Sequence, residues 1–160
     1  MKKIVLFMFC ALLMTGCGKK ASSKDDILVD EIEFLDEETS SFEQLRNEVE
    51  SFKQGLPMDL GSGLIAIDCQ LLAKEVLYIY EMDEDYYELE NTRETRQSMK
   101  ALVAGSMQDE KSSSDFRKML QLCVQSGRGL GYQYVGDQTG TTITIHFTDQ
   151  ELERLLDQDY

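Results

Sequence analysis

Few residues in this chain could do catalytic chemistry, and His146 is its only histidine. A Ser-His-Asp or Cys-His arrangement would have to use this one side chain as its base. The sequence has no CxxC motif and no cluster of cysteine with histidine, so the usual ligand set of a zinc site cannot be assembled. It therefore predicts no catalytic residue, no metal site and no cofactor, and an enzyme is the less favoured class.

Carboxylates are grouped in the run Asp83–Glu90. If Asp83 took the first position of an EF-hand loop, Asp85 would take the third and Glu94 the twelfth. Glu88 would then stand at the sixth position, where the sharp turn needs glycine, so the pattern favours a solvated acidic connection over a calcium site. A small hydrolase that uses carboxylates of this run as acid and base is the alternative function.

His146 lies in a segment of alternating apolar and polar residues, in which Ile143, Ile145 and Phe147 share one face. This alternation predicts a β-strand over residues 141–147 whose apolar face meets the core. His146 projects from the opposite face, so we expect it to be at least partly exposed and to have no catalytic partner. The polar side chains of matching phase form a candidate binding patch on an open sheet face: Gln133, Thr142, Thr144 and His146.

The start of the chain has the organisation of a signal peptide. Two lysines precede the uncharged apolar run Ile4–Met14, which is too short to span a bilayer as a stable helix. Two small residues then lead to Cys17, and Leu12–Cys17 resembles the lipobox of bacterial lipoproteins. The resemblance implies cleavage before Cys17, diacylation of its thiol and acylation of the new N-terminus, and two or three acyl chains anchor a protein stably. An ordinary secretory signal with an incidental cysteine is the alternative.

A lipidated Cys17 would place the protein in the cell envelope, with the lipid bilayer as one partner and an envelope protein as a further candidate. In lipoproteins of Gram-negative bacteria, Asp after the lipidated cysteine often retains the protein at the inner membrane. Gly18 stands there instead, so the resemblance implies the outer membrane, facing either the periplasm or the cell surface. Removal of Lys2 and Lys3 with the signal takes the formal net charge from −14 to −16, and a field of that sign repels nucleic acid.

Three parts follow from these features: a signal peptide over residues 1–16, a lipidated N-terminus and acidic linker over 17–40, and a single domain over 41–160. The linker carries an apolar island between Ile27 and Leu35 whose role stays open. The domain is expected to start with a helix, because Ser41 and Gln44 have the spacing of a capping box.

The remaining elements follow from hydrophobic periodicity and turn residues. Further helices are expected after Asn91, after the break at residues 111–114 and after Thr148, where Thr148 and Glu151 have the spacing of a second capping box. Strands are expected over residues 64–72, 76–82, 129–135 and 141–147, and the 76–82 strand is apolar on both faces, which predicts a central position in the sheet. The order is α-β-β-α-α-β-β-α, which consists of two hairpins separated by a helical pair. This order predicts an α+β domain, with an antiparallel sheet of about four strands and helices packed mainly on one face.

Cys69 and Cys123 are both predicted to lie in the core. Cys69 has the strand phase of Ile65 and Ile67, and Cys123 shares a helix face with Met119. A common core does not place two thiols in contact, so a disulfide and two free buried thiols both stay open.

From Phe42 onward the pattern is similar to small uncharacterised bacterial lipoproteins. The resemblance rests on the segments Met58–Gly63, Tyr78–Tyr80 and Gly129–Gly136, and it implies no activity and no site residues. Together with the predicted anchor and the scarcity of catalytic side chains, it favours a membrane-anchored envelope lipoprotein with a soluble, non-catalytic binding or assembly domain.

Overall fold

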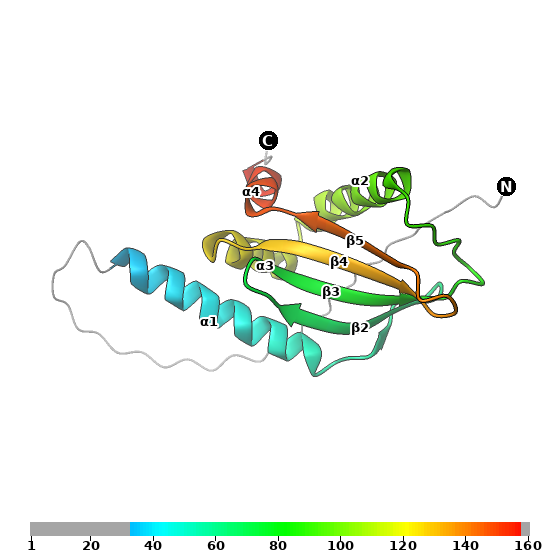
Figure 1. Cartoon of the computed structure of the whole chain (residues 1–160). Helices are drawn as coiled ribbons and strands as arrows, with labels where there is room; N and C mark the ends of the chain where they lie inside the picture. The colour runs from blue at the N-terminus through cyan, green and yellow to red at the C-terminus, as the bar shows by residue number, and fades with distance from the viewer. Residues whose placement is uncertain (1–32, 158–160) are drawn as a thin grey trace.

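The computed structural model describes residues 33–157, with side chains from Ser40 onward. These residues form an α+β fold with a five-stranded mixed sheet and four helices (Figure 1). The predicted signal peptide, Cys17 and most of the linker lie outside the described residues. In chain order the elements are α1 (Glu33–Lys53), β1 (Met58–Asp59), β2 (Leu64–Leu71), β3 (Glu75–Met82), α2 (Arg93–Glu110), α3 (Ser114–Gln125), β4 (Gly129–Gly136), β5 (Thr142–Phe147) and α4 (Asp149–Asp157).

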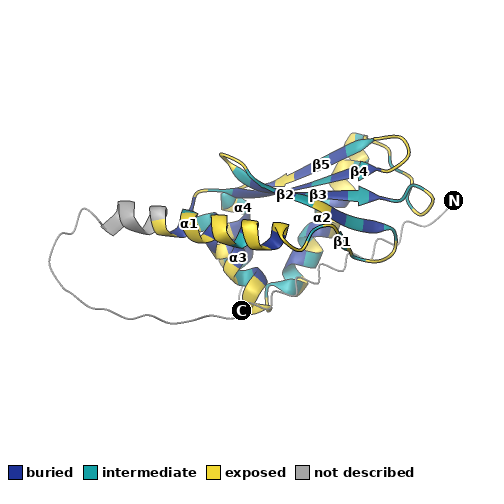
Figure 2. Cartoon of the chain, turned by 90° about the horizontal axis from the view of Figure 1, so that it is seen from below, coloured by how far each residue is buried: buried dark blue, intermediate teal, exposed yellow. Residues whose placement is uncertain are grey.

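The helices cover one face of the sheet and leave the other face open, as Figure 2 shows. The core lies between the two layers and takes alternate residues from each strand, as a half-covered sheet requires. Within the described residues, no helix has both the length and the apolar character that a membrane crossing needs. The most deeply buried core side chains include Leu45, Val49, Cys69, Val76, Val103, Leu120, Cys123, Leu130, Tyr134, Ile143 and Leu152.

The strand order is β1-β2-β3-β4-β5, with β3 at the centre, as its apolar character on both faces predicts. The hairpins β2-β3 and β4-β5 are antiparallel, as expected. The predicted sheet needs two corrections, because β3 and β4 run parallel and β1 adds a short edge strand. Parallel neighbours need a crossover connection of a dozen or more residues, and α2 with α3 supplies one here.

The first helix begins earlier than its predicted cap. α1 starts at Glu33, so Ser41 lies inside the helix and not at its N-cap. Ser41 is buried and its hydroxyl donates to Oε1 of Gln125 in α3 at 3.3 Å. The sequence pattern of a capping box is local, and at this position packing of α1 against α3 determines the conformation.

A bulge changes the phase of β2. The register shifts between Ala66 and Asp68, which leaves Ile67 as an extra residue without a cross-strand partner. Cys69 is buried as predicted, whereas Ile67 is 39% exposed and Ile65 only partly buried. The expectation that Ile65 and Ile67 share the core face with Cys69 is therefore wrong, because strict alternation does not hold across a bulge.

Four tyrosines from β3 and β4 form a stacked aromatic layer beneath the helices. Tyr80 stacks on Tyr134 at 5.4 Å between ring centroids and on Tyr132 at 6.3 Å, and Tyr78 stacks on Tyr132 at 5.8 Å. The parallel register of the two strands places these residues side by side. The edge of Phe147 meets Tyr132 at 6.2 Å, which joins this layer to the end of β5.

Candidate functional site

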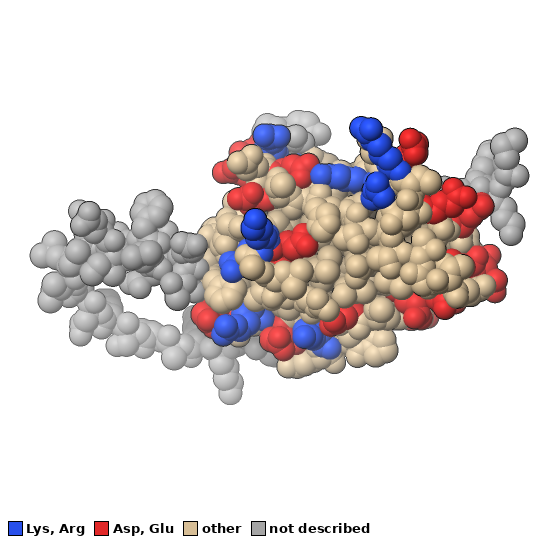
Figure 3. Space-filling view, viewed as in Figure 1, with Lys and Arg blue, Asp and Glu red and all other residues tan. Residues whose placement is uncertain are grey.

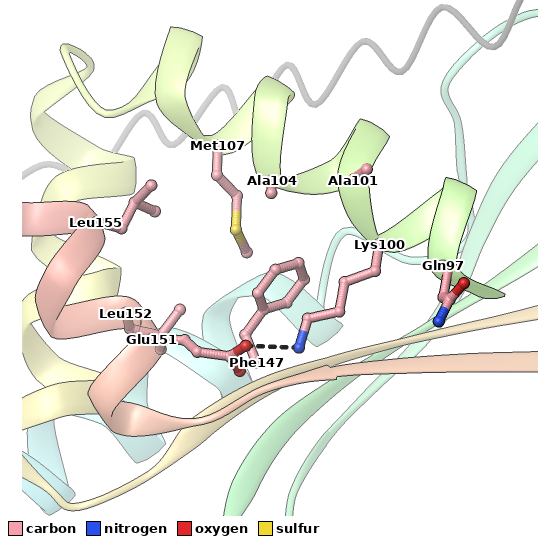
Figure 4. A pocket seen from close by; sticks show the side chains of 9 residues that line it. All are labelled: Gln97, Lys100, Ala101, Ala104, Met107, Phe147, Glu151, Leu152 and Leu155. Atoms are coloured by element: carbon pink, nitrogen blue, oxygen red, sulfur yellow. Dashed lines mark hydrogen bonds and ion pairs between the residues drawn. The ribbon is translucent and has the colours of Figure 1, made fainter.

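A groove opens between α2 and α4, over the end of β5 (Figure 4). Its volume is about 400 Å³, within the range of protein ligand sites. Most of its wall is apolar, and its polar members are Gln97, Lys100 and Glu151. The full lining is Gln97, Lys100, Ala101, Ala104, Met107, Phe147, Glu151, Leu152 and Leu155.

The α2 wall of the groove is low because two of its residues are alanines. Ala101 and Ala104 follow Gln97 at helical spacing, so their methyl groups and the Met107 side chain share one side of the helix. Thr92 fixes the start of α2, since its side chain accepts the N–H of Thr95 at 3.0 Å. The small side chains leave room for an incoming side chain or helix to approach the backbone of α2.

The α4 wall is fixed by the capping box that the sequence predicts. The Thr148 N–H donates to Oε2 of Glu151 at 2.9 Å, and the Glu151 N–H donates to Oγ1 of Thr148 at 3.2 Å. Leu152 is fully buried and Leu155 nearly so, which holds α4 on the sheet. The capping box thereby holds the Glu151 carboxylate on the first turn of α4, facing α2 (Figure 4).

One ion pair crosses the groove. Nζ of Lys100 donates to Oε1 of Glu151 at 2.7 Å and lies 4.9 Å from the centre of the Phe147 ring. Partial burial of Glu151 acts to raise the pKa of its carboxyl, but the hydrogen bonds from Lys100 and Thr148 outweigh burial and hold that pKa below its usual value. Both side chains are more than a third exposed, so the pair is worth at most about 1 kcal/mol and opens at low cost.

The predicted patch residues do lie together, but on the open face of the sheet and not in the groove. Gln133 pairs with Thr144 in the register of β4 and β5, and its Nε2 donates to Oγ1 of Thr144 at 3.4 Å. Thr142 and Thr144 are partly buried and His146 is exposed, which confirms the phase predicted for this strand. That the patch binds a partner stays a prediction.

The sequence pattern missed the neighbour of His146. Its Nδ1 lies 2.7 Å from Oε2 of Glu75, which comes from β3 on the far side of β4. Gly131 lies between them, and a Cβ at that position would approach Glu75 Oε2 to 3.0 Å. The absence of a side chain at Gly131 lets the two residues meet, and no local spacing in the sequence announces such a diagonal contact.

His146→Ala is expected to lower the free energy of unfolding by less than about 1 kcal/mol. The His146 side chain is 57% exposed, so water replaces much of what the substitution removes. Urea denaturation of the two proteins measures the difference. A loss of several kcal/mol would show that the pair with Glu75 is a main support of the sheet.

Cys69 and Cys123 are both buried, and both thiols are free. Burial raises the pKa of each thiol to about 12, so neither is a reactive thiolate at neutral pH. Of the two arrangements that the sequence leaves open, the structure has the free thiols and no disulfide.

The acidic run after β3 has a structural contact within the domain. Glu84 accepts the N–H groups of Gln138 and Thr139 at 2.8 and 2.6 Å, and the Thr139 hydroxyl at 2.6 Å. These donors hold the pKa of the Glu84 carboxyl below its usual value. In the part of the chain that the structure describes, no three His, Cys, Asp or Glu side chains are grouped to hold a metal ion.

Sequence reasoning did not find the groove. The sequence predicts a thin apolar stripe for α2, made of Leu89, Met99, Leu102, Val103 and Met107. Met99, Val103 and Met107 are buried, whereas Leu102 is 45% exposed, so the prediction is wrong for Leu102. The neighbouring small residues Ala101 and Ala104 carried the only local indication, a side of the helix without large side chains. That α4 would stand opposite this side depends on the tertiary fold.

Neither a protein-family model nor a curated protein matches this sequence. Solved structures, however, are similar to this chain. A protein from Pseudomonas aeruginosa described as secreted is similar over 72% of this chain and 96% of its own, with 14% identity and a TM-score of 0.51.

Two further structures are pilotins of type II secretion systems. EpsS from Vibrio vulnificus is 14% identical over 73% of this chain and 96% of its own, with a TM-score of 0.52. AspS from Vibrio cholerae is 13% identical over 73% of this chain and 96% of its own, with a TM-score of 0.51. At these identities the similarity establishes a common fold.

Proposed function

We propose that the protein is a lipid-anchored envelope lipoprotein whose domain is a non-catalytic binding module. Its ligand is an amphipathic helix of another envelope protein, which lies in the groove between α2 and α4. The observation that carries this proposal is the groove itself, with apolar walls from two helices and one weak ion pair across it. Grooves of this kind receive the apolar face of a helix.

The neighbours in fold support the same class of function. Two of them are pilotins of secretion systems, and the third is described as secreted. A pilotin-like role requires a membrane anchor and a binding surface. The lipobox-like segment ending at Cys17 supplies the first and the groove supplies the second.

Photo-crosslinking in cells tests the groove directly. A photoreactive amino acid at Ala104, in the groove, is compared with one at Leu102, which is 45% exposed on the opposite side of α2. The proposal expects a crosslink from position 104 to an envelope protein, within a segment of amphipathic helical pattern, and none from position 102. Equal crosslinking at both positions, or none at 104, would contradict it.

Anchoring is tested separately with Cys17→Ser. The substitution removes the thiol that accepts the diacylglyceryl group, so the product is expected to be uncleaved or unanchored protein that leaves the detergent phase in a phase-partition experiment. The unmodified chain is the control and is expected in the detergent phase. If the Cys17→Ser protein still partitions with detergent, the lipid anchor is not on Cys17.

A further inference from the structure

We propose that the helix bound in the groove carries a carboxylate beside its apolar residues, and that Lys100 selects it. This inference rests on the proposed function and specifies the chemistry of the partner. Lys100 would be a specificity-determining residue, and Glu151 the internal group that holds it in place before the partner binds.

The first observation is the hydrogen-bonding capacity on the two sides of the ion pair. An ammonium group has three N–H donors. Within residues 33–157, Nζ of Lys100 donates one hydrogen bond, to Oε1 of Glu151, and faces the Phe147 ring. The other Glu151 oxygen accepts from the backbone N–H and the hydroxyl of Thr148. Lys100 therefore has N–H donors left for a partner, whereas the Glu151 carboxylate already accepts hydrogen bonds from Thr148 at the start of α4.

The second observation is the distribution of charge along α2. Arg93, Arg96 and Lys100 follow one another at spacings of three and four, so they form a basic stripe that leads into the groove. Figure 3 shows Lys and Arg side chains gathered over α2. The chain as a whole has a formal net charge of −14, and between residues 54 and 92 Lys74 is its only basic residue. An acidic segment would be repelled by most of this protein and attracted at the N-terminal part of α2, where residues 93–100 carry three basic side chains and one acid, Glu94.

The contacts on each side of the groove define the partner. Its apolar residues would pack against Ala101, Ala104 and Leu155, and its carboxylate would accept a hydrogen bond from Lys100 Nζ. A lysine at the same place in the partner would meet Lys100 and be disfavoured. The Lys100–Glu151 pair need not break, because the ammonium can serve both carboxylates.

Three matched peptides test this inference against the mature chain, residues 17–160, expressed without the predicted signal peptide. All three form the same amphipathic helix, with leucine and alanine on the apolar face, and differ only in a flanking Glu, Gln or Lys. Fluorescence anisotropy is expected to show the Glu peptide binding about fivefold more tightly than the Gln peptide, with the Lys peptide weakest. The preference is expected to shrink as salt is raised.

Two charge-reversal variants locate the effect. Lys100→Glu is expected to invert the order, so that the Lys peptide binds best. Lys118→Glu changes the total charge equally but breaks an ion pair with Glu48 between α3 and α1, outside the groove lining, and is expected to keep the original order. Circular dichroism confirms that both variants are folded.

The outcomes separate this inference from the proposed function. Equal affinity for the three peptides, with binding still lost in Ala104→Glu, would overturn selection by Lys100 and leave the groove as a binding site. An order that inverts equally in Lys100→Glu and Lys118→Glu would also overturn it, since net charge would then be the cause. If no peptide binds, or if Ala104→Glu does not change the binding of any peptide, both this inference and the proposed function are contradicted.

Discussion

Replacement of Tyr134 by alanine is expected to lower the free energy of unfolding by about 3–5 kcal/mol, as for other large aromatic side chains removed from a core. Tyr134 is fully buried and stacks on Tyr80 at 5.4 Å. It also packs in the layer that connects the parallel strands β3 and β4, so its loss leaves a cavity at the centre of the sheet. Urea denaturation followed by circular dichroism measures the change.

Tyr134→Phe is the matched control. It keeps the ring and removes only the hydroxyl, so the expected cost is about 1 kcal/mol. A loss under 1 kcal/mol for Tyr134→Ala would mean that the tyrosine layer is not a main source of stability. Similar large losses for both variants would place the stabilisation in the hydroxyl and not in the stacked ring.

Ala104→Glu is expected to weaken binding of the partner helix by about thirtyfold or more, or about 2 kcal/mol. The longer side chain would occupy the groove and place a second negative charge near Glu151. Alanine and glutamate are both good helix formers, so α2 itself is expected to persist. Titration of the free partner segment, once crosslinking has identified it, into the mature chain measures the affinity.

Leu102→Glu provides the comparison, because it adds the same charge to the opposite, exposed side of α2. It is expected to change affinity by less than about twofold, which corresponds to about 0.4 kcal/mol. If the two variants weaken binding equally, the effect comes from net charge or from damage to α2, and the groove is not the site.

Much of the fold could be predicted from the sequence because periodicity and caps are local properties. The strand containing Ile143, Ile145 and Phe147 has its predicted phase, and the Thr148–Glu151 capping box has its predicted hydrogen bonds. Properties that depend on distant parts of the chain were predicted less well. The bulge at Ile67 and the parallel pairing of β3 with β4 both depend on which strands pair and in which register. This information is absent from any short stretch of the sequence.

The candidate site shows the same division. The patch around His146 follows from strand parity, and its residues do share the open face of the sheet. The contact of His146 with Glu75 depends on the missing side chain at Gly131 and on the strand order β3-β4-β5, which places β4 between the two residues. The groove needs α2 and α4 side by side, and these helices are separated in the chain by α3, β4 and β5. Composition and motifs were enough to propose an envelope lipoprotein, whereas the proposed binding groove could be found only in the fold.

Chemical-shift mapping tests the central claim most directly. The chemical shifts of the backbone amides of the mature chain are recorded during a titration. The ligand is the free partner segment that crosslinking from position 104 identifies. The account predicts that the largest changes fall between Gln97 and Met107, at Phe147, and between Glu151 and Leu155. Changes centred on Gln133, Thr144 and His146, with the groove amides unaffected, would contradict it and assign binding to the open face of the sheet.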